Sequence, residues 1–307
     1  MIALPRHGLG TAPLGGMFHE VSDDDAAATV HAALAAGTTY FDTAPQYGHG
    51  LAETRLGAAL LGEDRDRLTI STKVGRVLVA GTDPGTIFHG IPPVRPEFDF
   101  SADGVRRSLH DSFDRLGVER VDLALVHDPD DHEAEARATA FPALQRLRDE
   151  GLIGAIGCGM NQVGMLDRFV GDADALGLDA ILLAGRWTLL DRTGAALLDR
   201  CGERGVAVIV GGVFNSGLLA RPEPGATYDY AVAPAPLLAR AQAMAAACDR
   251  FGVPLTAAAV QFPWRHPAVT TVIVGARTPD EVVAHATTGA IEVPDDLWAE
   301  LDRISAG

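Results

Sequence analysis

Short runs of aliphatic and β-branched residues alternate along this chain with longer stretches in which apolar residues recur every three or four positions. The short runs predict buried strands, and the longer stretches predict amphipathic helices. Eight strands are expected, at residues 8–15, 38–41, 68–72, 121–126, 154–158, 180–184, 206–210 and 270–274. Strand followed by helix, eight times over, predicts parallel β/α units.

Capping residues mark where several of the helices begin and end. Ser22 suits the N-cap of a helix over 22–36, because its hydroxyl can accept from a free backbone N–H, and the acidic run 23–25 favours the positive end of the helix dipole. Gly37 then suits the terminating position. The same signals predict helices at 101–116, 141–150 and 195–203, each followed by a glycine, and the alanine-rich stretch 239–247 has helical spacing.

Eight β/α units in 307 residues predict one closed (β/α)8 TIM barrel that forms a single domain over 1–307, with no linker. The alternative is an open, doubly wound sheet. That architecture calls for Gly-x-Gly-x-x-Gly after the first strand, whereas Gly8, Gly10, Gly15 and Gly16 do not have this spacing. The barrel is therefore preferred.

Two predicted connections are longer than a turn requires. They cover 76–100 after strand three and 214–236 after strand seven, and the second contains four prolines. Both follow the carboxyl end of a strand, where barrel active sites are built. We expect both loops to contribute to the rim of one active site.

Composition and charge narrow the class of protein. The chain has 25 basic and 41 acidic residues, a formal net charge of −16, and no Lys/Arg-rich run, so nucleic acid is not expected as a partner. No apolar stretch approaches the length of a membrane helix, which predicts a soluble protein. Cys158, Cys201 and Cys248 form no paired motif, so we expect buried thiols in a reducing cytoplasm.

Four residues with the chemistry of proton transfer fall at the ends of three successive strands. They are Asp42 and Tyr47 after strand two, Lys73 after strand three and His127 after strand four. A lysine at the end of an apolar strand needs a carboxylate partner, and Asp42 is placed to supply it. We expect the positive field of this lysine to lower the pKa of the Tyr47 phenol toward neutrality, making Tyr47 an acid/base with His127 beside the reacting oxygen.

A series of motifs resembles the aldo-keto reductase family over essentially the whole chain. The motifs are Phe41-Asp42-Thr43-Ala44-Pro45-Gln46-Tyr47-Gly48, Ser71-Thr72-Lys73, His127, Ile156-Gly157 and Ile273-Val274-Gly275-Ala276-Arg277-Thr278-Pro279. The resemblance implies the same barrel, a bound nicotinamide cofactor, and a catalytic tetrad of Asp42, Tyr47, Lys73 and His127.

The segments 11–17, 157–162, 182–191 and 211–217 look most like the sugar-oxidising branch of that family, the D-threo-aldose 1-dehydrogenases (L-fucose dehydrogenases), which also holds a pyridoxal 4-dehydrogenase. This implies oxidation of the anomeric hydroxyl of an aldose to a lactone. The alternatives are an NADPH-dependent aldehyde or carbonyl reductase, pyridoxal oxidation, and a non-enzymatic nucleotide-binding subunit, against which the complete tetrad argues.

The resemblance also implies the cofactor contacts. They are expected from Gly16, Met17, Asn161, Phe214, Asn215, Ser216, Gly217, Leu218, Gly275, Arg277, Thr278, Glu281 and His285.

The sequence departs from the family pattern at several of these contacts. Gly159 and Ala184 stand where the family usually has polar residues, and Gly211 stands where a tyrosine stacks on the nicotinamide, which leaves Trp187 or Phe214 as substitutes. Glu281 replaces a frequent arginine. Its carboxylate would repel the 2′-phosphate of NADP and accept a ribose hydroxyl, so NAD is preferred, with NADP as the alternative that Arg277 favours.

The remaining expectations concern the substrate and the assembly. His19 and Trp187 are candidates to line the pocket of a sugar or aldehyde substrate. The acidic cluster around His132 has no metal-ligand spacing, so no metal is expected. The assembly is expected to be a monomer or a small homo-oligomer.

Overall fold

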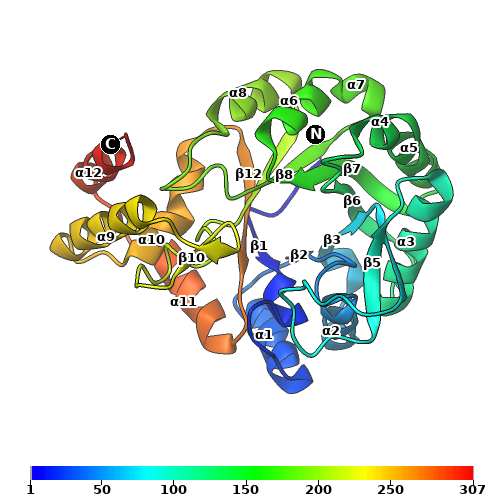
Figure 1. The fold of residues 1–307 in the computed structure, drawn as a ribbon, viewed down its shortest axis with the longest axis horizontal. Coiled ribbons are helices and arrows are strands. Elements are labelled where there is room, and N and C mark those ends of the chain that lie inside the picture. The colour runs from blue at the N-terminus through cyan, green and yellow to red at the C-terminus, as the bar shows by residue number, and fades with distance from the viewer. Residues whose placement is uncertain (1, 307) are drawn as a thin grey trace.

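A computed structural model describes residues 2–306, and its centre is a closed barrel of eight parallel strands (Figure 1). The barrel strands are β1 (His7–Gly10), β2 (Tyr40–Asp42), β3 (Thr69–Val74), β6 (Val121–His127), β7 (Ile153–Met160), β8 (Ala180–Ala184), β9 (Ala207–Gly211) and β12 (Val269–Gly275). Around the barrel they run in the order β1, β12, β9, β8, β7, β6, β3, β2. The predicted (β/α)8 barrel is confirmed.

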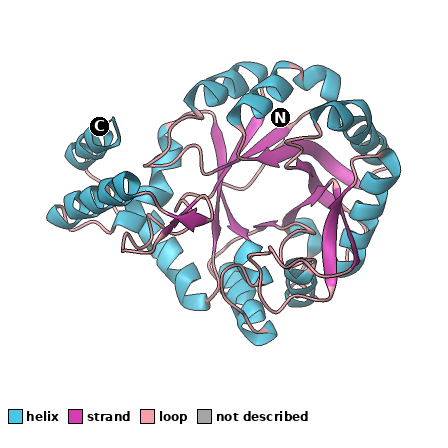
Figure 2. Ribbon diagram, in the orientation of Figure 1, coloured by secondary structure: helices cyan, strands magenta, loops and turns pink. Residues whose placement is uncertain are grey.

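Helices surround the barrel on its outer side (Figure 2). Their bounds are α1 (Asp23–Ala35), α2 (Leu51–Ala59), α3 (Ala102–Leu116), α4 (Glu133–Glu135), α5 (Phe141–Asp149), α6 (Val163–Gly171), α7 (Ala173–Leu176), α8 (Ala195–Arg204), α9 (Ala235–Arg250), α10 (Leu255–Gln261), α11 (Pro279–Gly289) and α12 (Asp295–Ala306). The last of these packs with α9 beyond the helical ring (Figure 1). Among residues 2–306, no helix combines the length and apolar character needed to cross a membrane.

The buried apolar residues form two clusters that the barrel wall separates. The larger cluster fills the layer between the strands and the helices. The smaller one lies inside the barrel and includes Tyr40, Leu123, Leu125, Leu182 and Ile273. Because apolar side chains fill the barrel interior, polar groups are left to gather at its carboxyl-terminal end.

Two details of the chain path differ from the predicted elements. The first strand ends at Gly10 instead of residue 15, because Pro13 lies in a 3-10 helix (Ala12–Gly15) that turns the chain across the top of the barrel. The two long connections also carry strands of their own. The first contains a hairpin of β4 (Arg76–Ala80) and β5 (Val94–Phe98), and the second a short hairpin of β10 (Thr227–Tyr228) and β11 (Ala231–Val232).

Candidate active site

The barrel brings Asp42 and Lys73 together at the carboxyl ends of neighbouring strands. In the parallel register Asp42 lies opposite Ser71, two residues before Lys73. Lys73 Nζ lies 2.8 Å from Asp42 Oδ2 and donates a second hydrogen bond, also 2.8 Å, to the carbonyl of Thr43. Both side chains are only 2 % exposed. The predicted pairing of Lys73 with Asp42 is therefore present. A buried ammonium is stable only with partners of this kind.

The other carboxylate oxygen of Asp42 is also occupied. Ser71 donates from Oγ to Asp42 Oδ1 at 2.7 Å, and the hydroxyl of Tyr40 lies 3.0 Å from the same Ser71 oxygen. A hydrogen-bonded chain therefore runs from inside the barrel to the ion pair. Lys73 is also the single lysine of the chain, every other basic residue being arginine. A compact ammonium fits this enclosed place, where a planar guanidinium needs more room.

Tyr47 reaches the ion pair from the turn that follows β2. Lys73 Nζ lies 4.7 Å from the centroid of the Tyr47 ring. The turn is held by a close approach of two glycines: a Cβ on Gly48 would lie 2.4 Å from the carbonyl oxygen of Gly15, and Gly48 has a positive φ of +62°. Any larger residue would push the turn away from the 3-10 helix at Ala12–Gly15 and move the phenol.

The pKa of the Tyr47 phenol is raised well above its usual range, first by burial and then by the carboxylate of Asp42. This corrects the expectation that Lys73 would lower it toward neutrality. The physical reason is the pairing itself, because Asp42 at 2.8 Å cancels most of the positive field of Lys73. The phenol is therefore protonated at neutral pH.

His127 closes the group at the end of β6, with its ring edge-on to Tyr47 at a centroid distance of 6.0 Å. Burial, followed by the positive charges of Arg76 and Lys73, lowers the pKa of His127 well below its usual range, so the imidazole is neutral. Its Nε2 lies 3.4 Å from Asp128 Oδ2, which Arg76 holds at 3.0 Å. Because a carboxylate accepts, it favours the tautomer with the proton on Nε2.

All four tetrad residues line, or lie beside, one cavity of about 640 Å³, a size that fits a small-molecule site. Among the further polar side chains that line it, and that the sequence analysis did not assign to the site, are Arg76, Asp128 and Tyr230. The first two follow strand ends and so carried the same signal as the tetrad. Tyr230 lies in a long connection, where no pattern points to it.

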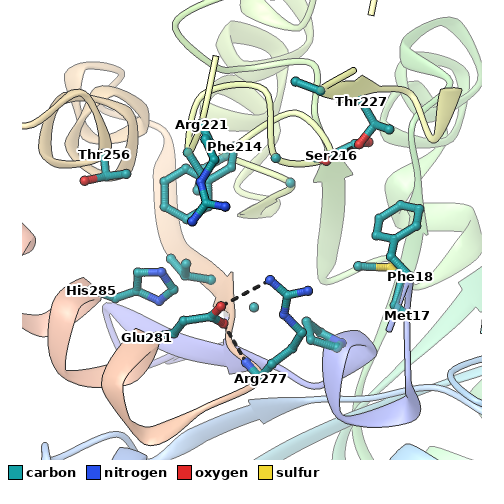
Figure 3. Close-up of a pocket in the computed structure, with 18 of the residues that line it drawn as sticks. Met17, Phe18, Phe214, Ser216, Arg221, Thr227, Thr256, Arg277, Glu281 and His285 are labelled. Carbon is teal, nitrogen blue, oxygen red and sulfur yellow. Dashed lines mark hydrogen bonds and ion pairs between the residues drawn. The ribbon is translucent and has the colours of Figure 1, made fainter. Parts of the chain in front are cut away.

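Figure 3 shows residues that line a second cavity, of about 710 Å³, which adjoins the first. The two cavities share five lining residues, Pro13, Met17, Gly212, Ile273 and Gly275. The expected cofactor residues that line the second cavity are Met17, Phe214, Ser216, Gly217, Gly275, Arg277, Glu281 and His285. Arg221 also lines it and was not anticipated. Asn161 lines the first cavity.

Charged and aromatic groups face one another across the second cavity. Glu281 accepts from the backbone N–H of Arg277 at 2.8 Å and from its guanidinium at 3.2 Å, as Figure 3 shows. The ring of Phe214 lies 5.4 Å from that of His285. Together with Arg221 and the N-terminus of α11, these groups suit a molecule with phosphates and a planar base, so a nicotinamide dinucleotide fits the donor set.

Four of the expected cofactor residues line neither cavity. Asn215 is buried and bonds to Thr188 and to the carbonyl of Gly185. Leu218 lies in the core, and Thr278 caps α11 by accepting from the N–H of Glu281. Gly16 is needed for packing, because a Cβ there would lie 2.3 Å from the carbonyl oxygen of His89. These four residues therefore stabilise the segments around the cavities and do not line them.

The two expected substrate residues also lie elsewhere. Trp187 belongs to the core: its indole donates to the carbonyl of Pro263 at 3.1 Å, and its ring packs on Phe262 at 5.1 Å. This corrects its expected place in the substrate pocket, because a ring anchored at both ends cannot turn toward it. His19 lines the second cavity, away from the tetrad.

His132, within the acidic cluster that follows β6, packs against aromatic rings. The ring of His132 packs against Phe98 and Phe100 at centroid distances of 5.1 and 5.2 Å. Over the described range 2–306, no three His, Cys, Asp or Glu side chains are grouped so that they could hold a metal ion.

Comparison with known proteins adds independent information. The sequence pattern of the Aldo/keto reductase family matches residues 7–306. A D-threo-aldose 1-dehydrogenase from Pseudomonas sp is 43 % identical over 311 residues, covering 98 % of this chain and 94 % of that protein. A pyridoxal 4-dehydrogenase from Microbacterium luteolum is 41 % identical over 319 residues, covering 96 % and 92 %.

A similar fold is also found among solved structures. That of a glycerol dehydrogenase from Gluconobacter oxydans superimposes with a TM-score of 0.75 at 26 % identity, covering 99 % of this chain and 92 % of that chain. By sequence and by fold, this chain is thus similar to proteins named as dehydrogenases.

The buried ion pair predicts how the protein responds to loss of the lysine. Lys73→Met leaves the Asp42 carboxylate buried without its counter-ion, and we expect the free energy of unfolding to fall by about 3–5 kcal/mol. Adding Asp42→Asn removes the uncompensated charge and should recover most of the lost free energy of unfolding. Urea denaturation at neutral pH measures both effects.

A surface ion pair provides the control. Arg107 and Asp111 lie 3.7 Å apart on the exposed side of α3, and Arg107→Met should change the free energy of unfolding by less than about 0.5 kcal/mol. A loss as small as this in Lys73→Met would contradict the structural role given to the buried pair.

Proposed function

This chain belongs to the aldo/keto reductase family, and on that premise we propose that it oxidises the anomeric hydroxyl of an aldose of the D-threo type, such as L-fucose, to a lactone, with NAD as acceptor. The relative that is 43 % identical, a D-threo-aldose 1-dehydrogenase, supports the substrate. The relative at 41 %, a pyridoxal 4-dehydrogenase, makes pyridoxal the second candidate.

The observation that carries the proposal is the convergence of Tyr47, Lys73 and His127 on one cavity that adjoins a cavity suited to a dinucleotide. In the oxidation, the phenolate oxygen of Tyr47 accepts the proton of the anomeric hydroxyl. The Nε2–H of His127, whose 3.4 Å distance to Asp128 Oδ2 is too long for a strong hydrogen bond, donates to the same substrate oxygen and orients it. A nicotinamide cofactor, held by the residues that line the second cavity, would supply the acceptor for the hydride of C1.

The polarity of the first cavity supports a substrate rich in hydroxyl groups. The guanidinium of Arg76 donates to Gln46 Oε1 at 3.1 Å and to Asp128 Oδ2 at 3.0 Å. This network holds a carboxylate at the cavity wall, and a carboxylate accepts hydrogen bonds from hydroxyl groups. Asp83, Asp130 and Asp131 line the same cavity, so an uncharged sugar is favoured over a phosphorylated one.

The second cavity supports NAD over NADP. Arg221 would provide positive charge for the two bridging phosphates. Glu281 binds Arg277 through both carboxylate oxygens, so the arginine is already compensated and a negative charge faces the cavity. A further phosphate on the ribose would meet that charge. We also propose a reducing, cytoplasmic location, which the three buried free cysteines support.

The first prediction from this proposal concerns the substrate. With NAD present, the wild type should oxidise L-fucose and D-arabinose faster than pyridoxal, and should reduce simple aldehydes with NADPH only weakly. Tyr47→Phe, which removes the proton acceptor, should lower kcat by at least about 100-fold. NADH formation at its absorption band measures the rates.

NADH binding to Tyr47→Phe, followed by fluorescence, provides the control, because the cofactor cavity does not include Tyr47. Equal rates in the two proteins would exclude Tyr47 as the base. A preference of the wild type for NADPH and aldehydes would replace the dehydrogenase assignment with a reductase.

The raised pKa of Tyr47 predicts the pH dependence of oxidation. Only the deprotonated phenol accepts a proton, so log kcat/KM for L-fucose should rise with pH from about 6 to about 9, by up to about one unit per pH unit. Because the pKa of His127 is lowered, this histidine stays neutral across the same range and should add no step. A plateau of log kcat/KM that begins below about pH 8 would contradict a raised pKa of Tyr47.

A charge change at Glu281 tests the cofactor assignment. Glu281→Gln keeps the shape of the side chain and removes its charge, so the ratio of kcat/KM for NADP to that for NAD should rise at least about tenfold. Asp280→Asn is the matched control, because this neighbouring acid is exposed and lies outside the cavity. An equal change of this ratio in the two variants would show that cofactor preference depends on the overall negative charge of α11 and not on Glu281 itself.

A further inference from the structure

The hairpin in the second long connection has an unusual turn. Its two turn residues, Asp229 and Tyr230, have φ angles of +47° and +64°. A two-residue turn with positive φ at both positions normally selects Asn-Gly, because a side chain there crowds the backbone. A bulky aromatic residue at the second position is therefore strained, and such strain persists only where the surroundings enforce it.

The surroundings hold this turn from two sides. Arg186 donates two hydrogen bonds to the Asp229 carboxylate, at 3.0 and 2.8 Å, and the backbone N–H of Tyr230 donates to Ser216 Oγ at 3.1 Å. Beside them, the hydroxyl of Tyr228 donates to Asp191 at 2.9 Å. Because Arg186 directly follows the end of β8 and its Gly185, the tip of the hairpin is tied to the barrel rim.

The result of this anchoring is the position of one ring. Tyr230 lines the cavity that contains the tetrad, and its ring lies 6.4 Å from that of Phe18. The residue remains 55 % exposed, so the protein itself leaves much of the ring uncovered. The partial burial of Tyr230 and the nearby carboxylate of Asp128 raise the pKa of its phenol.

We propose that Tyr230 is the aromatic wall of the substrate site, held by the strained turn so that its ring stacks on the C–H face of a pyranose whose hydroxyls meet the wall of Arg76 and Asp128. This inference rests on the proposed aldose oxidation. Stacking needs a rigid ring, and the Arg186–Asp229 pair supplies that rigidity. A purely structural turn would gain from glycine at this positive φ, and stacking on a substrate accounts for a tyrosine in its place.

The test compares three variants of the full-length protein with NAD and L-fucose. Tyr230→Gly removes the ring and relieves the backbone, Tyr230→Phe keeps the ring, and Val232→Ala trims an exposed side chain of the same hairpin. We expect kcat/KM for L-fucose to fall about 10- to 100-fold in Tyr230→Gly, mainly through KM, and by no more than about threefold in Tyr230→Phe. The value for Val232→Ala should match the wild type.

Two further measurements separate binding from folding. The KM for NAD should stay within about twofold of the wild type in all three variants. The melting temperature of Tyr230→Gly should be unchanged or higher, because relief of the positive-φ strain offsets the lost ring contacts. A lower melting temperature together with lower activity would show a structural role and overturn the inference.

The same experiment distinguishes the two proposals. If the wild type turns over L-fucose and Tyr230→Gly does so with equal kcat/KM, only the role of Tyr230 fails. If the wild type turns over neither L-fucose nor D-arabinose, the proposed aldose oxidation fails, and the inference fails with it.

Discussion

The ion pair between Lys73 and Asp42 is the contact on which the site depends. Its two charges lie 2.8 Å apart with almost no exposure to solvent, and burying them would destabilise the protein if either partner were missing. The barrel makes the pair possible, because parallel register places the ends of β2 and β3 side by side. The site and the fold are thus stabilised by the same contact.

The electrostatic state of the site follows from this pairing. Since Asp42 compensates Lys73, the phenol of Tyr47 experiences burial more than positive field, and its pKa rises. His127 is buried beside Arg76 and Lys73, and its pKa falls. Both proton-transfer groups are therefore uncharged at neutral pH. In the proposed oxidation Tyr47 must therefore lose its proton first, because only the phenolate can accept the proton of the substrate hydroxyl.

Specificity is divided between rigid strand ends and anchored loops. The strand ends, with the turn after β2, hold the four tetrad side chains. The two long connections supply the walls of the cavity, including Phe88 and Phe98 from the first and Tyr230 from the second. Loops that are tied to the rim by ion pairs such as Arg186–Asp229 can shape a pocket without moving the tetrad, as is typical of barrel enzymes.

The sequence by itself determined the eight strands, the positions of most helices and the residues at the strand ends, because periodicity and capping are local properties. It also placed Asp42, Tyr47, Lys73 and His127 at one rim, since parallel strands end at the same edge. Only the tertiary structure decided what each residue faces. It buried Trp187 against Pro263 and Phe262, raised the pKa of Tyr47, and turned Tyr230 into the cavity. These outcomes depend on contacts between distant segments, which no local pattern encodes.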